Sequence, residues 1–307
     1  MNRTFHRFWK RNRFGFLFVA PLLCFLAIFS VMPFFYGIVM SFFDVSSSAM
    51  TWKFLGVQNY VEMFQDPVFW NSVKTMAILF LPKLLFNVFM PFLFAELIFA
   101  LRKKKHQAIY RVLYLLPVVA PGVVGMLLWK FIYASDGLIN SIVLLFNPNF
   151  QPIDFLNSDA KPWITIISLI LLGFPFVGGT NVLIYLSGLM QIGDNVFEAC
   201  RIDKCGTFRR IWKVDMPLCV GQFRYFLIFG IIGTLQDYSM QIVLWKNCPD
   251  YLYVPGFYLY QQAYTADRSG YAAAIGVFLF VVIALFTALG NFLTKERKRK
   301  KLRKEGA

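Results

Sequence analysis

Residues 198–217 read EACRIDKCGTFRRIWKVDMP, and they interrupt a chain that is otherwise strongly apolar. Within this stretch the apolar residues recur at helical spacing, and the basic residues lie largely off that face. Gly206, near the middle, permits the left-handed turn that ends a helix. Pro217 comes at the start of the next apolar run, where a missing backbone donor costs little. The pattern predicts a helix, a turn and a second helix between two membrane segments.

The composition of the whole chain indicates a membrane protein. Of its 307 residues, 58% are hydrophobic and only 15% are charged, whereas ordinary globular domains carry about 25% charged residues. A soluble domain of this size would lack the charges to cover its surface. The five cysteines form no CxxC pair, so neither a metal site nor a disulfide framework is indicated.

Six windows are long and apolar enough to cross a bilayer, which takes roughly 20 residues. The first is too long to be a secretory signal peptide. We therefore expect an all-α polytopic membrane protein with six transmembrane helices. The windows are 14–43, 73–101, 108–133, 163–190, 218–243 and 270–293.

The distribution of Lys and Arg predicts the orientation of these spans. Twenty-three of the 31 basic residues fall in residues 1–13, in two alternate loops and in the tail 294–307. Under the positive-inside rule, both termini and the loop 191–217 are then cytoplasmic. We expect one permease domain over 14–293, between a basic N-terminus and a basic tail. The net charge of +15 is then explained by basic segments that lie beside anionic lipid, so it does not indicate binding of nucleic acid.

A loop that serves only to reverse the chain direction would be short. Residues 191–217 instead carry two patterned helices, so we expect the loop to have a further role. One interpretation is that the loop is held by another protein. The alternative is an amphipathic segment resting on lipid headgroups.

The loop resembles the EAA loop of permease subunits in type I ABC importers. The family pattern is Glu-Ala-Ala, then Asp-Gly-Ala, then an aromatic-rich run that ends in Ile-x-Leu-Pro. In this chain Lys204 stands where the family usually has Gly, and Gly206 lies two residues later. The residues in register are Glu198, Ala199, Cys200, Asp203, Val214, Met216 and Pro217.

Other segments are similar to sugar permeases, so the resemblance covers nearly the whole chain. GVQNYVEMFQDPVFWNSV at 56–73 resembles the segment before their second span. RVLYLLPVVAPGVVGMLLWKFIYASDGLIN at 111–140 resembles their third span and the Gly-Leu-Ile-Asn after it. FYLYQQAY at 257–264 and GYAAAIGVFLFVVIALF at 270–286 resemble the entry to their last span. The match indicates the carbohydrate-uptake branch, with maltose-type and glycerol-phosphate-type permeases.

The resemblance implies a subunit of an ATP-driven importer in the cytoplasmic membrane of a bacterium. In that family the EAA loop sits in a cleft of a cytoplasmic ATPase, whose closure switches the permeases from inward-facing to outward-facing. The implied partners are a second homologous permease in a heterodimer, two ATPase copies, an extracytoplasmic sugar-binding protein and membrane lipid. ATP and Mg would bind the ATPase, and this chain would hold no cofactor and no metal. It lacks the phosphate-binding motif GxxxxGK[ST], so we expect no enzymatic activity of its own.

Polar residues inside the spans are candidates for the solute path, because ionisable groups in lipid usually face the bundle interior or water. If Lys83 does not line the solute path, its side chain could instead extend outward to the interface or pair with an acid. The other polar residues could instead form hydrogen bonds between helices. The candidates are Lys83, Asn87, Thr180, Asn181, Gln236, Asp237 and Tyr238.

Three further features of the spans carry structural expectations. Gly178 and Gly179 would let another helix or a solute approach closely, and Pro175 would kink the fourth span. Glu96 would pair with Arg102 or with a neighbouring span.

Two other classes of protein are compatible with a polytopic chain. A self-sufficient secondary transporter often shows two related halves, but the sequence has no internal repeat. An integral membrane enzyme is disfavoured because clustered His, Asp or Ser residues are absent. The sequence does not name the sugar.

Overall fold

The computed structural model describes residues 15, 17–46, 48, 51–101, 103–157, 161–175 and 178–305, with side chains up to Phe292. The predicted N-terminal segment 1–13 and the side chains of the predicted tail lie outside this description. The chain divides into two compact units, residues 1–69 with 258–280 and residues 70–257 with 281–307. The single permease domain over 14–293 stays a prediction.

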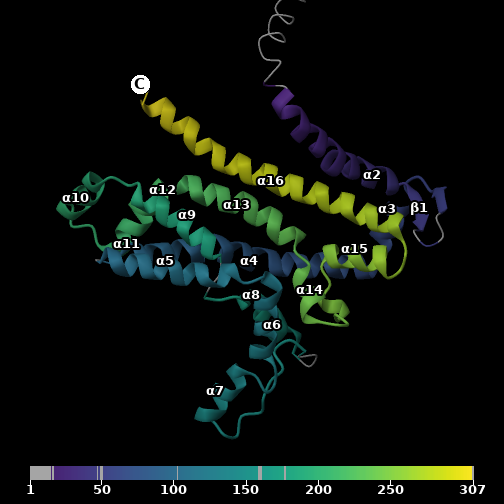
Figure 1. Cartoon of the computed structure of the whole chain (residues 1–307), viewed down its shortest axis with the longest axis horizontal. Helices are drawn as coiled ribbons and strands as arrows, with labels where there is room; N and C mark the ends of the chain where they lie inside the picture. The colour runs from purple at the N-terminus through teal and green to yellow at the C-terminus, as the bar shows by residue number, and fades with distance from the viewer. Residues whose placement is uncertain are drawn as a thin grey trace, which may run out of the picture. The chain divides into compact units, whose positions relative to one another are not determined.

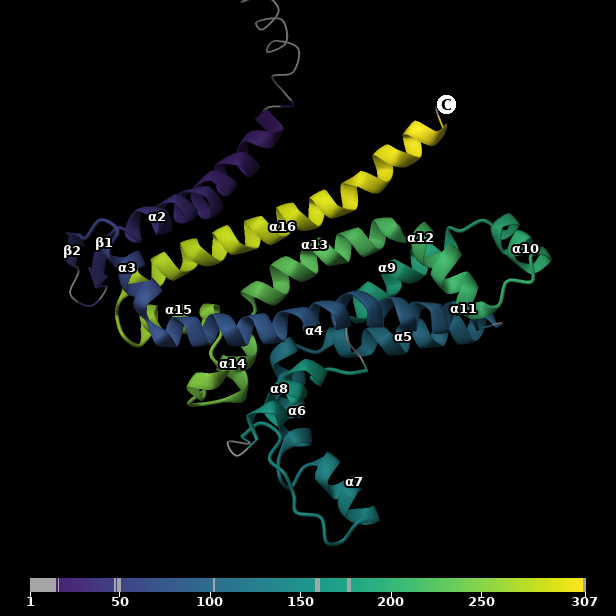
Figure 2. The same cartoon turned by 180° about the vertical axis from the view of Figure 1, so that it is seen from behind.

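Helices make up most of both units (Figure 1, Figure 2). In chain order the elements are η1 (Ala27–Val31), α2 (Met32–Met40), β1 (Phe43–Ser46), β2 (Thr51–Phe54), α3 (Gln58–Gln65), α4 (Pro67–Phe99), α5 (Lys104–Val119), α6 (Gly122–Tyr133), α7 (Leu138–Phe146), α8 (Pro162–Leu171), α9 (Gly179–Met190), α10 (Asp194–Ile202), α11 (Thr207–Arg210), η2 (Ile211–Asp215), α12 (Met216–Leu218), α13 (Val220–Gln236), α14 (Ser239–Leu244), η3 (Asp250–Leu252), α15 (Pro255–Tyr264) and α16 (Ser269–Glu305).

The fold is that of a polytopic membrane protein, and the described residues include four segments long and apolar enough to span a membrane. A fifth is obtained if Thr207–Leu218 and Val220–Gln236, which meet at a bend of 72°, count as one span. The count of six stays a prediction. The four segments are Leu17–Met40, Pro67–Phe99, Gly122–Phe146 and Ser269–Phe292.

Two predicted windows are broken where the sequence carries helix-breaking residues. In the third window the helix stops at Ala120, which is extended because the ring of the following Pro121 disfavours helical geometry there. In the fourth, α8 and α9 are separated by a segment in which Gly173 and Gly178 have positive φ angles of 93° and 66°. The kink expected at Pro175 is therefore a complete interruption of the helix.

The prediction of an all-α fold is wrong for one short segment, because residues 43–54 form an antiparallel hairpin. Phe43 pairs with Phe54, and Ser46 pairs with Thr51. The ring of Phe43 lies 5.6 Å from that of Trp52 and 5.2 Å from that of Phe54. These aromatic side chains favour paired strands, whereas the apolar pattern places the segment at the end of a span and in a loop.

Buried polar contacts fix the first unit, and they come from the quoted segment 56–73. The amide nitrogen of Asn59 donates to the carbonyl oxygens of Ser41 and Phe43, each at 2.9 Å. The carboxylate of Asp66 accepts from the hydroxyl groups of Tyr258 and Tyr271. These bonds join the hairpin, α3, α15 and the start of α16.

An aromatic cluster forms the core of the second unit. Tyr185 of α9 is fully buried, and its ring lies 4.9 Å from that of Phe223 and 4.8 Å from that of Phe226, both on α13. Phe92 of α4 lies 5.4 Å from Tyr185. The three helices α4, α9 and α13 are therefore packed through one group of rings.

Asp66 generates a testable prediction about stability. Burial acts to raise the pKa of Asp66, but hydrogen bonds from Tyr258, Tyr271 and the backbone outweigh it and lower the pKa below the usual 3.8. Its contribution is therefore complete at neutral pH and is lost as the pH falls below about 4. Asp66→Asn should lower the free energy of unfolding by about 1.5–3 kcal/mol at pH 7, as measured by denaturation in detergent.

The pH dependence and a matched variant check this assignment. The difference between the natural protein and Asp66→Asn should shrink as the pH falls from 5 to 3. Asp44→Asn changes an exposed acid of the same unit and should have little effect. An equal loss of stability in both variants would contradict the role of the Asp66 hydrogen bonds.

Candidate functional site

The loop predicted to contact a partner begins with α10, and its turn has a defined hydrogen-bond pattern. The N–H of Cys205 donates to the carbonyl of Cys200 at 2.8 Å, and the N–H of Lys204 donates to that of Arg201 at 3.1 Å. This is the Schellman arrangement, which requires a left-handed residue just after the helix. Lys204 occupies that position, with a φ of 49°.

The sequence predicts the left-handed turn at Gly206, and this prediction is wrong. Gly206 is extended, with φ −64° and ψ 156°, and it precedes the first residue of α11. The turn instead uses Lys204, the position at which the resembling family usually has Gly. A Gly there would adopt the same angle without a steric penalty, so the sequence carries some backbone strain at this turn.

Four of the predicted residues lie on α10 or directly after it, and three of them are exposed. Glu198, Ala199 and, just beyond the helix, Asp203 are exposed, while Cys200 is half-buried. Ile202 is 81% exposed although it is apolar. Both views show α10 set apart at the end of a pair of loops (Figure 1, Figure 2). This geometry leaves the helix available to another surface.

The second half of the loop is also rich in exposed apolar side chains. Phe208 is 80% exposed and Trp212 is 59% exposed. Pro217 lies exposed in α12, which forms the end of the helical segment Thr207–Leu218, so it does not begin the next span as predicted but comes just before the bend into α13. Rings of this size are rarely left in water on a soluble surface, so this half of the loop suits contact with lipid or protein.

Arg210 holds a cluster of buried charges beneath the loop, which the sequence reasoning missed. Its Nε lies 2.8 Å from an oxygen of Asp215, and its Nη2 lies 3.4 Å from an oxygen of Glu96 on α4. Glu96 was expected to pair with Arg102 or a neighbouring span. Its partner among the described residues is Arg210, and Arg102 lies outside them. The helical spacing of the loop gave no signal for this pairing, because the partners are 114 residues apart.

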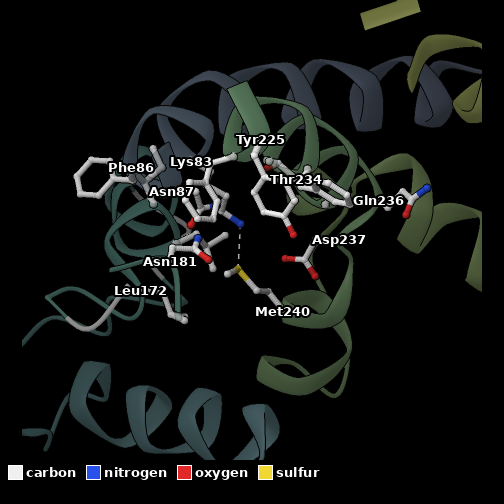
Figure 3. Close-up of a pocket in the computed structure, with 16 residues that line it drawn as sticks. Lys83, Phe86, Asn87, Leu172, Asn181, Tyr225, Thr234, Gln236, Asp237 and Met240 are labelled. Atoms are coloured by element: carbon white, nitrogen blue, oxygen red, sulfur yellow. Dashed lines mark hydrogen bonds between the residues drawn. The ribbon is translucent and has the colours of Figure 1, made fainter. Parts of the chain in front are cut away.

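A cavity of about 590 Å³ lies between helices of the second unit and contains five of the seven predicted path residues (Figure 3). Polar groups enter it from α4, α9 and the junction of α13 with α14. Aromatic rings from α4 and α13 provide flat apolar walls, which suit sugar rings. The predicted residues at its wall are Lys83, Asn87, Asn181, Gln236 and Asp237.

The two charged groups of the cavity make different contacts. The ammonium of Lys83 donates to the sulfur of Met240 at 3.0 Å, a weak acceptor. Asp237 accepts from the backbone N–H of Ser239 at 3.1 Å and from its hydroxyl group. Lys83 and Asp237 point into the same cavity (Figure 3) but form no direct ion pair in the described part of the chain.

Two predicted residues lie away from this wall. Thr180 is exposed. Tyr238 packs against Gly256, where an added Cβ would meet the Tyr238 ring at 3.1 Å. The cavity instead uses aromatic residues that the sequence did not single out, among them Phe86, Tyr225 and Phe229. The run of aromatic residues along α13 was the available signal for Tyr225 and Phe229, but a span rich in Phe offers no means to tell inward rings from lipid-facing ones.

Gly179 confirms the expected close helix approach. An added Cβ at Gly179 would lie 2.4 Å from the carbonyl oxygen of Tyr114 on α5. Any larger residue would push α9 from α5. Asn181, two positions later on α9, lines the cavity.

Comparison with known proteins gives the same resemblance. No protein-family model matches the chain. The lactose transport system permease protein LacF of Rhizobium radiobacter is 25% identical, with 92% of this chain and 95% of LacF covered. The probable ABC transporter permease protein YurN of Bacillus subtilis is 28% identical, with 88% and 92% covered. The arabinooligosaccharides transport system permease protein AraP of Bacillus subtilis is 26% identical, with 92% and 88% covered.

Solved structures show the same fold. A crystal structure of a bacterial ABC transporter that imports the acidic polysaccharide alginate matches with a TM-score of 0.81 and 21% identity, covering 96% of this chain and 99% of that chain. A second, in complex with alginate pentasaccharide-bound periplasmic protein, matches with a TM-score of 0.80 and 22% identity, covering 94% and 96%. The predicted resemblance to carbohydrate-uptake permeases of ABC transporters is confirmed.

The strained turn at Lys204 leads to a prediction. Lys204→Gly should stabilise the end of α10 by about 1 kcal/mol, because a side chain at a left-handed position costs at least that much. Amide hydrogen exchange in the last turn of α10 should slow by about fivefold. Lys204→Ala removes the charge but keeps the Cβ, so it should give no such slowing. Equal slowing in both variants would assign the effect to charge and contradict the strain.

Proposed function

We propose that this chain is the membrane-spanning permease subunit of an ATP-driven ABC importer, forming half of the path for a sugar or oligosaccharide. The observation that carries the proposal is the exposed helix α10, with Glu198 and Ala199 on its open face, in a chain similar to sugar permeases along nearly its whole length. A helix that projects in this way has the form needed to enter a cleft of a motor subunit.

In the proposed topology the chain crosses the bacterial cytoplasmic membrane six times, with both termini in the cytoplasm. The basic residues of the loop support this orientation, since Lys and Arg are enriched on the cytoplasmic side. The two shorter apolar helices Pro162–Leu171 and Gly179–Met190 would together form one broken span. Broken backbone is tolerated at membrane depth where protein or a water-filled cavity surrounds it.

The loop 191–217 couples transport to ATP hydrolysis in this proposal. The small side chain of Ala199 permits close approach of a partner, and Glu198 is available to a basic group on it. Cys200, beside them on α10, is half-buried. Closure of two ATPase copies around bound ATP and Mg would pull this loop and its counterpart on a second, homologous permease. This chain itself contributes no catalytic group.

The cavity between α4, α9 and α13 is the proposed solute site. Sugars carry hydroxyl groups that both donate and accept, and Asn87 and Asn181 offer matching amides. The aromatic walls would stack on the rings. An extracytoplasmic binding protein would deliver the solute, as the periplasmic protein in the alginate transporter complex suggests by analogy.

Co-purification and coupling test this function together. In mild detergent the chain should bring down a second permease and an ATPase, and the complex in proteoliposomes should take up sugar only with ATP. Ala199→Asp or Glu198→Lys should leave insertion intact and lower uptake per ATP hydrolysed by about tenfold or more, because the altered face no longer fits the ATPase.

An exposed acid elsewhere provides the control. Asp136→Asn, in the loop after α6, should couple as the natural chain does. A chain that purifies alone and moves solute in proteoliposomes without ATP would instead be a secondary transporter. Unchanged uptake in both loop variants would count against the coupling role of α10.

The cavity generates a separate prediction. Lys83→Met removes the ammonium from the cavity while keeping its apolar stem, and should lower uptake by about 10- to 100-fold, the effect of losing a hydrogen bond from a charged group. Assembly with the ATPase and basal ATP hydrolysis should be retained. Lys130→Met makes the same change at an exposed position of α6 and should stay within twofold. Equal uptake in both variants would remove Lys83 from the solute path.

A further inference from the structure

A buried cluster of three charges lies where the loop 191–217 meets the C-terminal end of α4. Asp215 is fully buried, and Glu96 is only 3% exposed. The guanidinium of Arg210 reaches both carboxylates, at 2.8 Å and 3.4 Å. One cation thus bridges two acids that come from separate helical segments. The proposed function uses none of these three residues.

Arg210 also contacts α10 through an aromatic ring. Its guanidinium carbon lies 5.6 Å from the centre of the Phe197 ring, within the range of a cation–π interaction. Phe197 in turn lies 5.6 Å from Phe99, the last residue of α4. The side chain of Arg210 therefore contacts three elements. These are α10 through Phe197, α4 through Glu96 and η2 through Asp215.

The cluster is connected to the cavity by continuous helix on the side of α4, whereas a bend of 72° separates the segment of Asp215 from α13. Helix α4 runs without interruption through Pro91 to Phe99, and it carries both Glu96 and the cavity residue Asn87. Glu96 comes nine positions after Asn87, a separation of roughly 13 Å at the rise of an α-helix. On the other side, Asp215 is followed by α12 and then by α13, which provides Tyr225 and other residues of the cavity wall.

Stability alone is a poor explanation for such a cluster. Replacing a buried charged triad by apolar residues is often neutral or stabilising, whereas removing one member leaves an uncompensated charge at a large cost. A buried triad does supply a narrow choice of geometry, since both carboxylates keep an ionic partner only while the three side chains stay together. The cluster therefore resists sliding of the loop against α4.

We propose that Arg210 is a positioning residue that transmits movement of α10 to the cavity, by locking the loop to α4 through Glu96 while Asp215, in the same helical segment as Arg210, holds the guanidinium in place. This inference rests on the proposed function, because it assigns a route for the coupling that the loop performs. Pulling on α10 moves Phe197 and Arg210, and the ion pair of Arg210 with Glu96 carries that movement to α4, a helix of the cavity wall. Without this ion pair α10 moves while α4 lags behind.

The test uses the assembled transporter in proteoliposomes and measures sugar uptake per ATP hydrolysed. Arg210→Met should lower this ratio at least tenfold, while ATP hydrolysis and co-purification of the ATPase persist. The triple variant Glu96→Gln, Arg210→Met, Asp215→Asn removes every charge, so it should fold well and show the same loss. Arg210→Lys, which keeps one cation in place, should recover part of the ratio. A purely structural role predicts normal coupling in the triple variant.

Arg209→Met is the matched control, because Arg209 is exposed and forms no ion pair in the part of the chain that is described. It should stay within twofold of the natural transporter. Glu96→Gln, an isosteric change, gives the answer if the larger changes prevent assembly, with an expected loss of at least threefold. If the triple variant assembles, a normal ratio of uptake to ATP hydrolysis in it would overturn the inference. If it does not assemble, a normal ratio in Glu96→Gln would do so. A natural chain that purifies without an ATPase would overturn the proposed function instead.

Discussion

Backbone hydrogen bonding in hydrocarbon is the constraint on which the rest of this fold depends. No water is present there to satisfy a free N–H or C=O, so a span must be helical unless protein or a cavity surrounds the exception. Of the interruptions in the second unit, one between α8 and α9 and one between α13 and α14 border the cavity, whereas the one at Ala120 between α5 and α6 does not. Leu172 lies at the first break and Asp237 at the second, and both line the same cavity. These two breaks therefore coincide with a polar cavity of the kind that the constraint tolerates.

The polar groups of the cavity are supported by close packing around them. Gly179 lets α9 approach α5 at a distance that any Cβ would prevent, and Gly230 does the same for α13, where a Cβ would lie 2.8 Å from a methyl group of Leu84. The rings around Tyr185 then fill the space between α4, α9 and α13. A cavity with rigid walls keeps its amides and charges in place, which lowers the entropy lost when a solute binds.

The sequence predicted the parts of this structure that depend on composition and local period. Apolar length located most of the spans, and helical spacing located the two halves of the loop 191–217. Polar residues within apolar windows located five positions of the cavity wall. The features it missed depend on contacts between distant residues. Arg210 looked like one more cytoplasmic cation among several, and only the fold shows that Glu96 and Asp215 lie beside it. The hairpin at 43–54 was too short for its alternation to stand out beside a long apolar run.

The turn at Lys204 shows how family resemblance and physical requirement can be separated. The resembling pattern has Gly after the Asp, and the structure needs a left-handed residue at that same position. The chain keeps the geometry and accepts a lysine in it, so the hydrogen bonds from Lys204 and Cys205 to the end of α10 must outweigh the strain. The geometry of the turn, and not the identity of its residue, is therefore what fixes the direction of α10. Since Phe197 of that helix packs against Phe99, a change in the turn would also alter how the loop rests on α4.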